Sequence, residues 1–247
     1  MNSKILIFWA SLCIFYYLHL SLCSAEPRDV KLSEEDLQTL LEKFMKKVNE
    51  ILHGNDPYNY AGSSGHSNSY GTYYNGSVSE LIISGISSMN VTYLNATQVD
   101  PNIYLGLDLS FSNIMVTGNY FLDLDTLSLL KLYGAGELGV IASSLGINVT
   151  ASVTQEAANN NVLQFTDLDI NLGLPELKLD VKNLLNRPAL STYASQILTD
   201  ISPKLLSEDG KLQTMLSSWA KSNLNDQAVK NEITLAFVIE FMQKFTQ

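Results

Sequence analysis

Cysteine is nearly absent from this chain, and the two that occur stand close to its N-terminus. Cys13 and Cys23 are followed by no other cysteine in the 247 residues. The part of the chain after residue 25 therefore has no disulfide bond, no thiol nucleophile and no cysteine ligand for a metal ion. Its 222 residues (247 minus 25) are enough to be held together by a hydrophobic core alone.

Lysine and arginine are scarce as well. The chain has 15 of them against 25 aspartates and glutamates, a formal net charge of −10, and none between Lys47 and Lys131. A protein that binds nucleic acid through its phosphates needs a stripe of basic side chains. The composition therefore argues against nucleic acid as a partner and against a lipid held by its phosphate group.

The N-terminal segment has the order of features found in secretory signal peptides. Lys4 precedes an apolar run from Ile5 to Leu22, which is followed by Cys23-Ser24-Ala25. This order predicts a signal peptide over residues 1–25. An uncleaved membrane anchor is the alternative. No later apolar run approaches the roughly 18 residues of a spanning helix, which predicts a secreted, extracellular protein with a single domain over 26–247 and no stable membrane insertion.

Four Asn-X-Ser/Thr motifs are consistent with secretion. One of them lies in the stretch SLGINVTASVT, residues 144–154, where apolar and polar residues alternate. Because alternate residues of a strand point to opposite faces, its asparagine is predicted on the solvated face, where a glycan must lie. The candidate N-glycosylation sites are Asn75, Asn90, Asn95 and Asn148.

The N-terminal part of the predicted domain indicates a helix followed by a segment without regular structure. Apolar residues at helical spacing predict a helix over 33–53, with Ser33 and Asp36 as an N-terminal capping box. Residues 54–76 are rich in Gly, Ser, Asn and Tyr and show no apolar period, so we expect a flexible loop there. A lid of tyrosines over a cavity is the alternative interpretation.

Nearly all of residues 78–181 alternate between apolar and polar side chains. This period of two predicts long antiparallel strands with one solvated face. After residue 188 the pattern becomes helical, with Leu190, Tyr193 and Ile197 on one stripe and Asp226 as the expected N-cap of the last helix. The fold class is therefore α+β, with one curved antiparallel sheet, helices at both ends of the chain, and the helices packed on its apolar face.

No arrangement of catalytic or metal-binding residues stands out. GAGELG, residues 134–139, has the glycine spacing of a dinucleotide loop, but the period of two continues where such a loop needs a helix, so a bend or bulge in the sheet explains the glycines better. After residue 25 the chain has two histidines, His53 and His66, and neither neighbours a serine nucleophile motif. Asp123 and Asp125 lack the further oxygen ligands that calcium needs. We expect no enzyme activity, no metal and no cofactor.

The central stretch FSNIMVTGNYFLDLDTLSLLKLYGAGELGV, Phe111 to Val140, carries a family resemblance. It resembles the secreted insect juvenile-hormone-binding and takeout family, in which a strand ending in Gly-x-Tyr is followed by an aliphatic strand and Gly-x-Gly. VKNLLN, Val181 to Asn186, is similar to a segment before the C-terminal helices of that family. The order of helix, sheet and helices is also similar to the mite group 7 allergens. The matching positions are Phe111, Gly118, Tyr120, Leu127, Leu129, Gly134 and Gly136.

The resemblance implies a fold and a function. The implied fold is a long curved antiparallel sheet wrapped around a long helix, which is half of a bactericidal permeability-increasing-like structure. The implied function is a carrier that holds a small hydrophobic ligand, such as a lipid, fatty acid or terpenoid, in an internal apolar tunnel. The chain departs from the family by lacking the N-terminal cysteine pair of the takeout type, by Ser112 in place of a proline, by Leu124 in place of a glycine, and by the long segment 54–76.

Apolar positions of the strands and helices are the candidate ligand contacts. One alternative is an extracellular structural or innate-immune interaction protein with the same fold, a filled core and no ligand, which segment 54–76 and the four glycosylation motifs suggest. Another is an esterase, which would need His53 or His66 beside a serine. The candidate lining residues are Phe44, Leu105, Leu107, Leu109, Ile114, Val116, Ile147, Val149, Ala151, Phe237 and Phe241.

Overall fold

The computed structural model describes residues 33–247, except for 70–71, 100–101, 127–129, 157–160 and 208–210. The predicted signal peptide lies outside the described residues. No helix in the described part of the chain is long and apolar enough to cross a membrane. The helices are α2 (Glu34–Gly54), the short 3-10 helix η1 (Ile86–Ser88), α3 (Pro188–Ser207), α4 (Lys211–Lys230) and α5 (Leu235–Phe245). The strands are β1 (Tyr58–Ser69), β2 (Thr72–Ser84), β3 (Asn90–Val99), β4 (Asn102–Thr126), β5 (Leu130–Glu156), β6 (Val162–Gly173) and β7 (Glu176–Val181).

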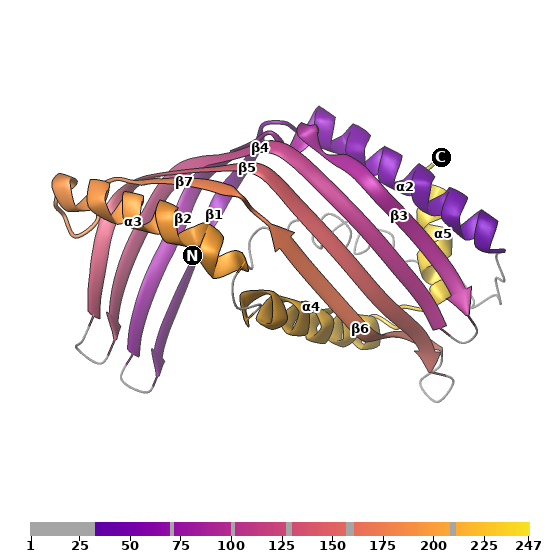
Figure 1. Ribbon diagram of the computed structural model, residues 1–247. Helices are drawn as coiled ribbons and strands as arrows, with labels where there is room; N and C mark the ends of the chain where they lie inside the picture. The colour runs from indigo at the N-terminus through magenta and orange to yellow at the C-terminus, as the bar shows by residue number, and fades with distance from the viewer. Residues whose placement is uncertain (1–32, 70–71, 100–101, 127–129, 157–160, 208–210) are drawn as a thin grey trace.

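Two very long strands run the whole length of the sheet and pair with each other throughout. β4 and β5 are antiparallel, from Asn102 opposite Thr154 to Thr126 opposite Leu130. In what we call the proximal half, β3 pairs with β4 and β6 with β5; in the distal half, β2 pairs with β4, β1 with β2, and β7 with β5. The sheet arches, with α4 beneath its proximal half (Figure 1). The expected α+β fold with a long curved antiparallel sheet is therefore confirmed.

The concave, inner face of the sheet stays apolar along its length although the alternation changes phase once. In the proximal half the inner residues have odd numbers, such as Leu105 and Ile147, and in the distal half they have even numbers, such as Ile114 and Ala142. The change occurs at Ser144, whose φ is 54°, while the register of β4 with β5 continues unbroken. This local distortion lets the apolar face follow the arch.

Polar side chains of α4 cover the backbone of the edge strand β6. The N–H of Ile170 donates to Ser217 Oγ (2.9 Å). Asn225 bonds the backbone of Phe165 twice, accepting from its N–H (2.7 Å) and donating to its carbonyl oxygen (3.1 Å). Ser217 and Asn225 are about two turns apart and lie on one side of the helix. α4 thus takes the place of a further strand at this edge. These hydrogen bonds determine which side of the helix faces the sheet.

Helices cover two more edges in the same way. On β7, the Val181 N–H donates to Ser195 Oγ (2.9 Å) and the Leu179 N–H donates to Thr199 Oγ1 (3.0 Å), both on α3. On β3, the side-chain amide of Gln38 in α2 donates to one backbone carbonyl and accepts from one N–H. Because backbone groups at a bare edge invite pairing with other chains, these side chains protect the sheet.

The segment expected to be a flexible loop, residues 54–76, is mostly a β-hairpin, so that prediction is wrong. β1 and β2 pair from Tyr58 opposite Ile83 to Ser69 opposite Thr72, and β2 pairs in turn with β4. Residues 63–68 of β1 are exposed. Because neither face of this part of the strand is buried, its sequence shows no alternation of apolar and polar residues. The backbone hydrogen bonds with β2 stabilise a strand here, although the residue composition of the segment does not favour one. The tyrosines of this segment that the structure describes lie on strands and form no lid.

The predicted helix cap is confirmed at the first helix and wrong at the last one. Ser33 caps α2, because its Oγ accepts from the Asp36 N–H (3.2 Å). Asp226 lies inside α4, which continues past it because Ala228 packs in the core. The cap of α5 is Thr234, whose hydroxyl oxygen accepts from a backbone N–H of the first turn.

The GAGELG glycines lie within β5, and their role is to permit a close backbone approach rather than a bend. A Cβ on Gly134 would lie 2.7 Å from the Asn183 carbonyl oxygen, and one on Gly136 would lie 2.6 Å from the Lys182 carbonyl oxygen. That Lys182 oxygen accepts from the Tyr120 hydroxyl (2.7 Å). Tyr120 and the two glycines therefore fix the segment that leads from β7 to α3. No helix follows the glycines, as expected for a sequence that does not form a dinucleotide loop.

The Asp56 carboxylate ties the start of β1 to the connection between β2 and β3. It accepts from the Gly85 N–H (3.0 Å) and from both the N–H (2.9 Å) and the hydroxyl of Ser87. Burial raises the pKa of Asp56, but the hydrogen bonds from Ser87 and Gly85 and the nearby charge of His53 outweigh it, and the net effect lowers the pKa.

Replacing Asn225 with alanine should destabilise the protein more than the same change at Asn223. Asn225→Ala leaves two backbone groups of Phe165 without their partner, which costs about 1–3 kcal/mol. Asn223 is exposed, and its amide bonds the Trp219 carbonyl in its own helix. Asn223→Ala is therefore the matched control, with an expected change within about 0.5 kcal/mol. Urea titrations measure both, and equal losses would contradict the role of α4 as an edge cover.

The contribution of Asp56 to stability should disappear at acid pH. Because its pKa is lowered on folding, its stabilising effect is complete above the unfolded-state pKa of about 4 and is lost as the pH falls through the folded-state value. The difference in free energy of unfolding between the native protein and Asp56→Asn should be constant near neutral pH and shrink below about pH 4. Urea titrations across this range test it, and a difference that persists at low pH would refute it.

Candidate functional site

The inner face of β4 and β5 forms one continuous apolar strip through both halves of the sheet. Cross-strand neighbours on this strip are directly opposite each other, so their side chains touch or nearly touch. All of the predicted sheet contacts lie on it. The pairs are Leu105 with Ala151, Leu107 with Val149, Leu109 with Ile147, Ile114 with Ala142, and Val116 with Val140.

Part of the proximal half of this strip packs against a buried cluster that includes residues of α4. Leu216 and Ala220 of α4 form a buried cluster with Ala151 of β5 and with two residues of β6. Of the other predicted contacts, Leu105, Ile147 and Val149 pack against the same cluster. These four positions of the strip therefore belong to or pack against a cluster that α4 and β6 form together. The sequence could not identify this helix as the filling element, because α4 has no strong apolar stripe of its own.

The aromatic residues predicted from the helices lie in two other places. Phe44 of α2 and Phe241 of α5 meet each other, with ring centroids 6.2 Å apart, and both contact Phe245. They belong to a cluster between α2 and α5. Phe237 packs instead against the cluster around Val153. The structure thus does not bring Phe44 or Phe241 onto the strip.

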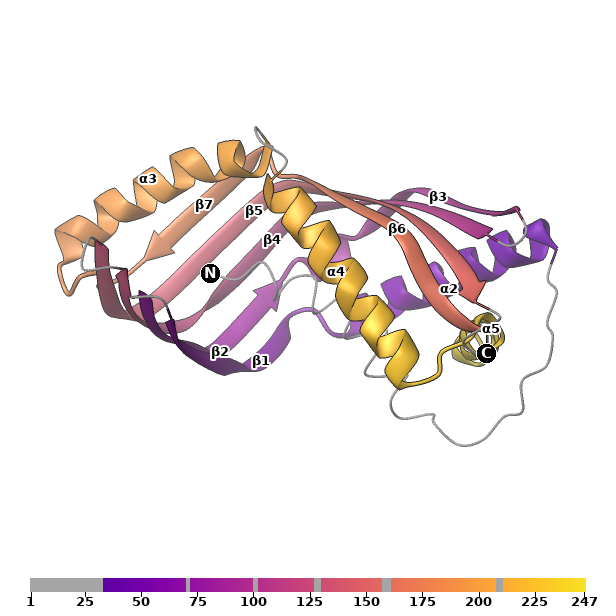
Figure 2. The same ribbon diagram turned by 90° about the horizontal axis from the view of Figure 1, so that it is seen from below.

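Among the described residues, neither α3 nor α4 joins a buried cluster on the distal part of the inner face. Val116, Leu122, Leu124 and Leu132 are half-buried, and the described side chains of α3 join none of the buried clusters. α3 runs along β7 at the margin of this face, and none of the described helices crosses it (Figure 2). We call these four residues, with Val140, the distal inner surface. Among the described residues, no buried cluster joins these side chains to α2, α3, α4 or α5.

α3 itself shows an unexpected arrangement. Its buried side is polar, because Ser191 and Ser195 are buried against the chain that follows β7 and against β7 itself. Its apolar stripe is exposed instead, with Tyr193 at 68% and Ile197 at 58%. The stripe was predicted from the sequence, but its exposure was not, because periodicity does not tell which side of a helix meets a neighbour.

The polar residues weighed for catalysis are dispersed. His53 is exposed at the end of α2, with its Nδ1 3.0 Å from the Asn49 carbonyl oxygen, and His66 is exposed on β1. Asp123 and Asp125 lie on β4, opposite Tyr133 and Lys131 of β5. Within the part of the chain that the structure describes, no three His, Cys, Asp or Glu side chains gather in a way that could hold a metal ion.

A surface cavity of about 430 Å³ lies on α2 and not on the inner face of the sheet. Lys46, Asn49, Glu50 and His53 line it. The side-chain oxygen of Asn49 is buried there without a hydrogen-bond partner. None of the predicted lining residues belongs to this cavity.

Comparisons with known proteins agree with the resemblance seen in the central stretch. The crystal structure of Takeout 1 from Epiphyas postvittana is similar at 16% identity and a TM-score of 0.45, over 77% of this chain and 92% of that one. The crystal structure of lipopolysaccharide binding protein is similar at 14% identity and a TM-score of 0.36, over 79% of this chain and 40% of that one. No curated protein sequence matches. The model of the haemolymph juvenile hormone binding protein (JHBP) family matches residues 20–233, so the chain belongs to this family.

Proposed function

We propose that this protein is a secreted carrier of an elongated hydrophobic molecule, such as a lipid, fatty acid or terpenoid, bound on the inner face of its sheet. Membership of a family named for hormone binding in haemolymph supports a carrier. The predicted signal peptide over residues 1–25 supports secretion.

The observation that carries the proposal is the difference between the two halves of the inner face. In the proximal half α4 contributes Leu216 and Ala220 to a buried cluster on the inner face. Within the described residues, no cluster joins the half-buried aliphatic side chains of the distal inner surface to α2, α3, α4 or α5. From Val116 to Leu124 this surface follows eight residues of a strand, which is about 26 Å. A long apolar chain lying along it would remove both itself and these side chains from water, at about 0.8 kcal/mol for each buried CH₂ group.

The chemistry of the surface favours binding over catalysis. Its side chains are aliphatic, and neither His53 nor His66 lies on it. Aliphatic walls recognise area and shape, and discriminate one methylene by only about 1–3 kcal/mol. We therefore propose a carrier without enzyme activity that accepts several related apolar ligands.

A filled, ligand-free protein with an extracellular structural or immune role is the second candidate. The packing of Leu216 and Ala220 against Ala151 favours it, because part of the predicted lining is ordinary core. The two candidates differ in whether the distal inner surface binds a ligand.

Native mass spectrometry of the secreted full-length protein distinguishes them. The carrier should show additional masses of bound lipid that are removed by organic extraction, and the extracted protein should take up a fluorescent fatty acid. Absence of both would leave the ligand-free protein as the better description. Serum-free medium and a co-expressed unrelated secreted protein control for contamination.

Filling the distal inner surface should weaken binding of the fluorescent fatty acid. Val116 is half-buried on the inner face, and its neighbour Met115 is exposed on the outer face of the same strand. Val116→Trp should raise the Kd about tenfold, which corresponds to about 1.4 kcal/mol. Met115→Trp adds the same ring on the other face and should leave the Kd unchanged.

Thermal melting of both variants checks that they are folded during the titration, since an added ring in a packed site costs about 1–3 kcal/mol of stability. Equal affinities of two folded variants would exclude the distal inner surface as the binding site.

A further inference from the structure

Four of the exposed aromatic rings on the outer face of the sheet form two pairs. Tyr73 and Phe121 form one pair in the distal half, and Tyr93 and Tyr104 form another in the proximal half. All four are between 39% and 50% exposed. Single exposed apolar residues are ordinary, but paired rings on a solvated face indicate a surface that something else covers.

Each pair surrounds the asparagine of a glycosylation motif. Tyr73 stands two residues before Asn75 on β2, so the two side chains share the outer face. Phe121 of β4 is opposite Ser77, the hydroxyl residue of the same motif. Phe121 is therefore the diagonal neighbour of Asn75, at a distance that aromatic side chains span.

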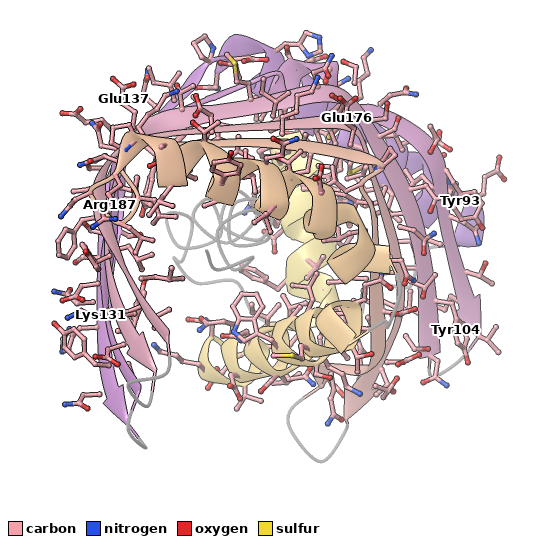
Figure 3. All side chains as sticks on the ribbon, turned by 60° about the vertical axis from the view of Figure 1, so that its left-hand side comes forward. Tyr93, Tyr104, Lys131, Glu137, Glu176 and Arg187 are labelled. Carbon is pink, nitrogen blue, oxygen red and sulfur yellow. The ribbon has the colours of Figure 1, made fainter. Side chains whose placement is uncertain are left out.

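The motif at Asn95 repeats this geometry position for position. Tyr93 stands two residues before Asn95 on β3, and Tyr104 of β4 is opposite Thr97, the hydroxyl residue of the motif. Gly106 is directly opposite Asn95, and a Cβ there would lie 2.8 Å from Tyr93 Cε1, so the Tyr93 ring lies over the glycine. Figure 3 shows Tyr93 and Tyr104 pointing away from the outer side of the sheet.

The other two motifs lack such rings. Ser88 and Gly146 stand two residues before Asn90 and Asn148. Asn148 is opposite Asp108 on one side, and its Nδ2 donates to the Asp108 carboxylate. The chain thus contains two motifs framed by aromatic rings and two that are not.

We propose that Asn75 and Asn95 carry N-linked glycans whose first N-acetylglucosamine packs on these ring pairs. The face of a pyranose ring that bears its axial C–H bonds is apolar and matches the face of an aromatic ring. Covering the rings removes apolar area from water and stabilises the folded protein. The proposal concerns the outer face and is independent of what the inner face binds.

The modification needs only a donor of known class. In N-glycosylation an oligosaccharide is linked through pyrophosphate to a lipid carrier. Asn Nδ2 forms a bond to the anomeric carbon of the first sugar and loses one proton, while the bond from that carbon to the pyrophosphate oxygen breaks and the oxygen keeps the electron pair. Asn95 is exposed and Asn75 half-buried on the outer face, so both products fit the folded protein.

The test uses the full-length chain secreted from cells that attach high-mannose glycans. Glycopeptide mass spectrometry should find Asn75 and Asn95 occupied. Enzymatic trimming to the first N-acetylglucosamine should leave the Tm unchanged, because the packed sugar remains. Complete removal of the glycans should lower the Tm by about 2–4 °C.

Matched variants assign the effect to the rings. Asn95→Gln should lower the Tm, whereas Asn90→Gln, at an exposed motif on the same strand without rings, should not. In a chain that carries both Tyr93→Ser and Tyr104→Ser, Asn95→Gln should have no further effect. The proposal would be overturned if Asn75 or Asn95 carried no glycan. It would also be overturned if complete deglycosylation left the Tm unchanged, or if the substitutions at Asn90 and Asn95 changed the Tm equally.

Discussion

The pairing of β4 with β5 is the constraint on which the rest of the molecule depends. Strands of 25 and 27 residues hold one register from end to end, and every other strand joins one of them directly or through β2. Four residues of the family motif lie where other segments come close to this hairpin, whereas Leu127 and Leu129 lie outside the described residues. A Cβ on Gly118 would lie 2.5 Å from Leu81 Cδ2 at an irregularity of β2, and Tyr120, Gly134 and Gly136 hold the segment after β7. These four residues of the motif therefore mark places where the backbone of another segment comes close to the hairpin.

The open edges of this sheet decide how the helices sit. Because edge strands present backbone groups that need partners, Ser195, Ser217 and Asn225 turn the polar sides of α3 and α4 toward β7 and β6. Because the polar sides of α3 and α4 are held at these edges, the directions of their apolar sides are determined as well. α4 then places Leu216 against the sheet, while α3 leaves Tyr193 exposed. The presence of α4 residues in the proximal cluster, and the absence of described α3 residues from the clusters, are consistent with these hydrogen bonds.

Much of the fold could be predicted from local patterns, and the failures share one cause. The alternation in residues 103–124 indicated both phases of the inner face, and Ser33 marked the start of α2. β1 was missed because a strand exposed on both faces has no apolar period, and its order comes from pairing with β2. Asp226 was misread as a cap because the continuation of α4 depends on the burial of Ala228. In each case a partner distant in sequence supplies the stabilising contact.

The fold class, the family and the two faces of β4 and β5 could be predicted from residue type and a period of two alone. Which part of the apolar face packs against a helix could be seen in the three-dimensional arrangement alone, because it depends on the positions of α3 and α4. The tertiary structure also decided which asparagines stand beside aromatic rings. Tyr104 and Phe121 lie on a different strand from Asn95 and Asn75. Their proximity follows from the register of the strands and not from spacing along the chain.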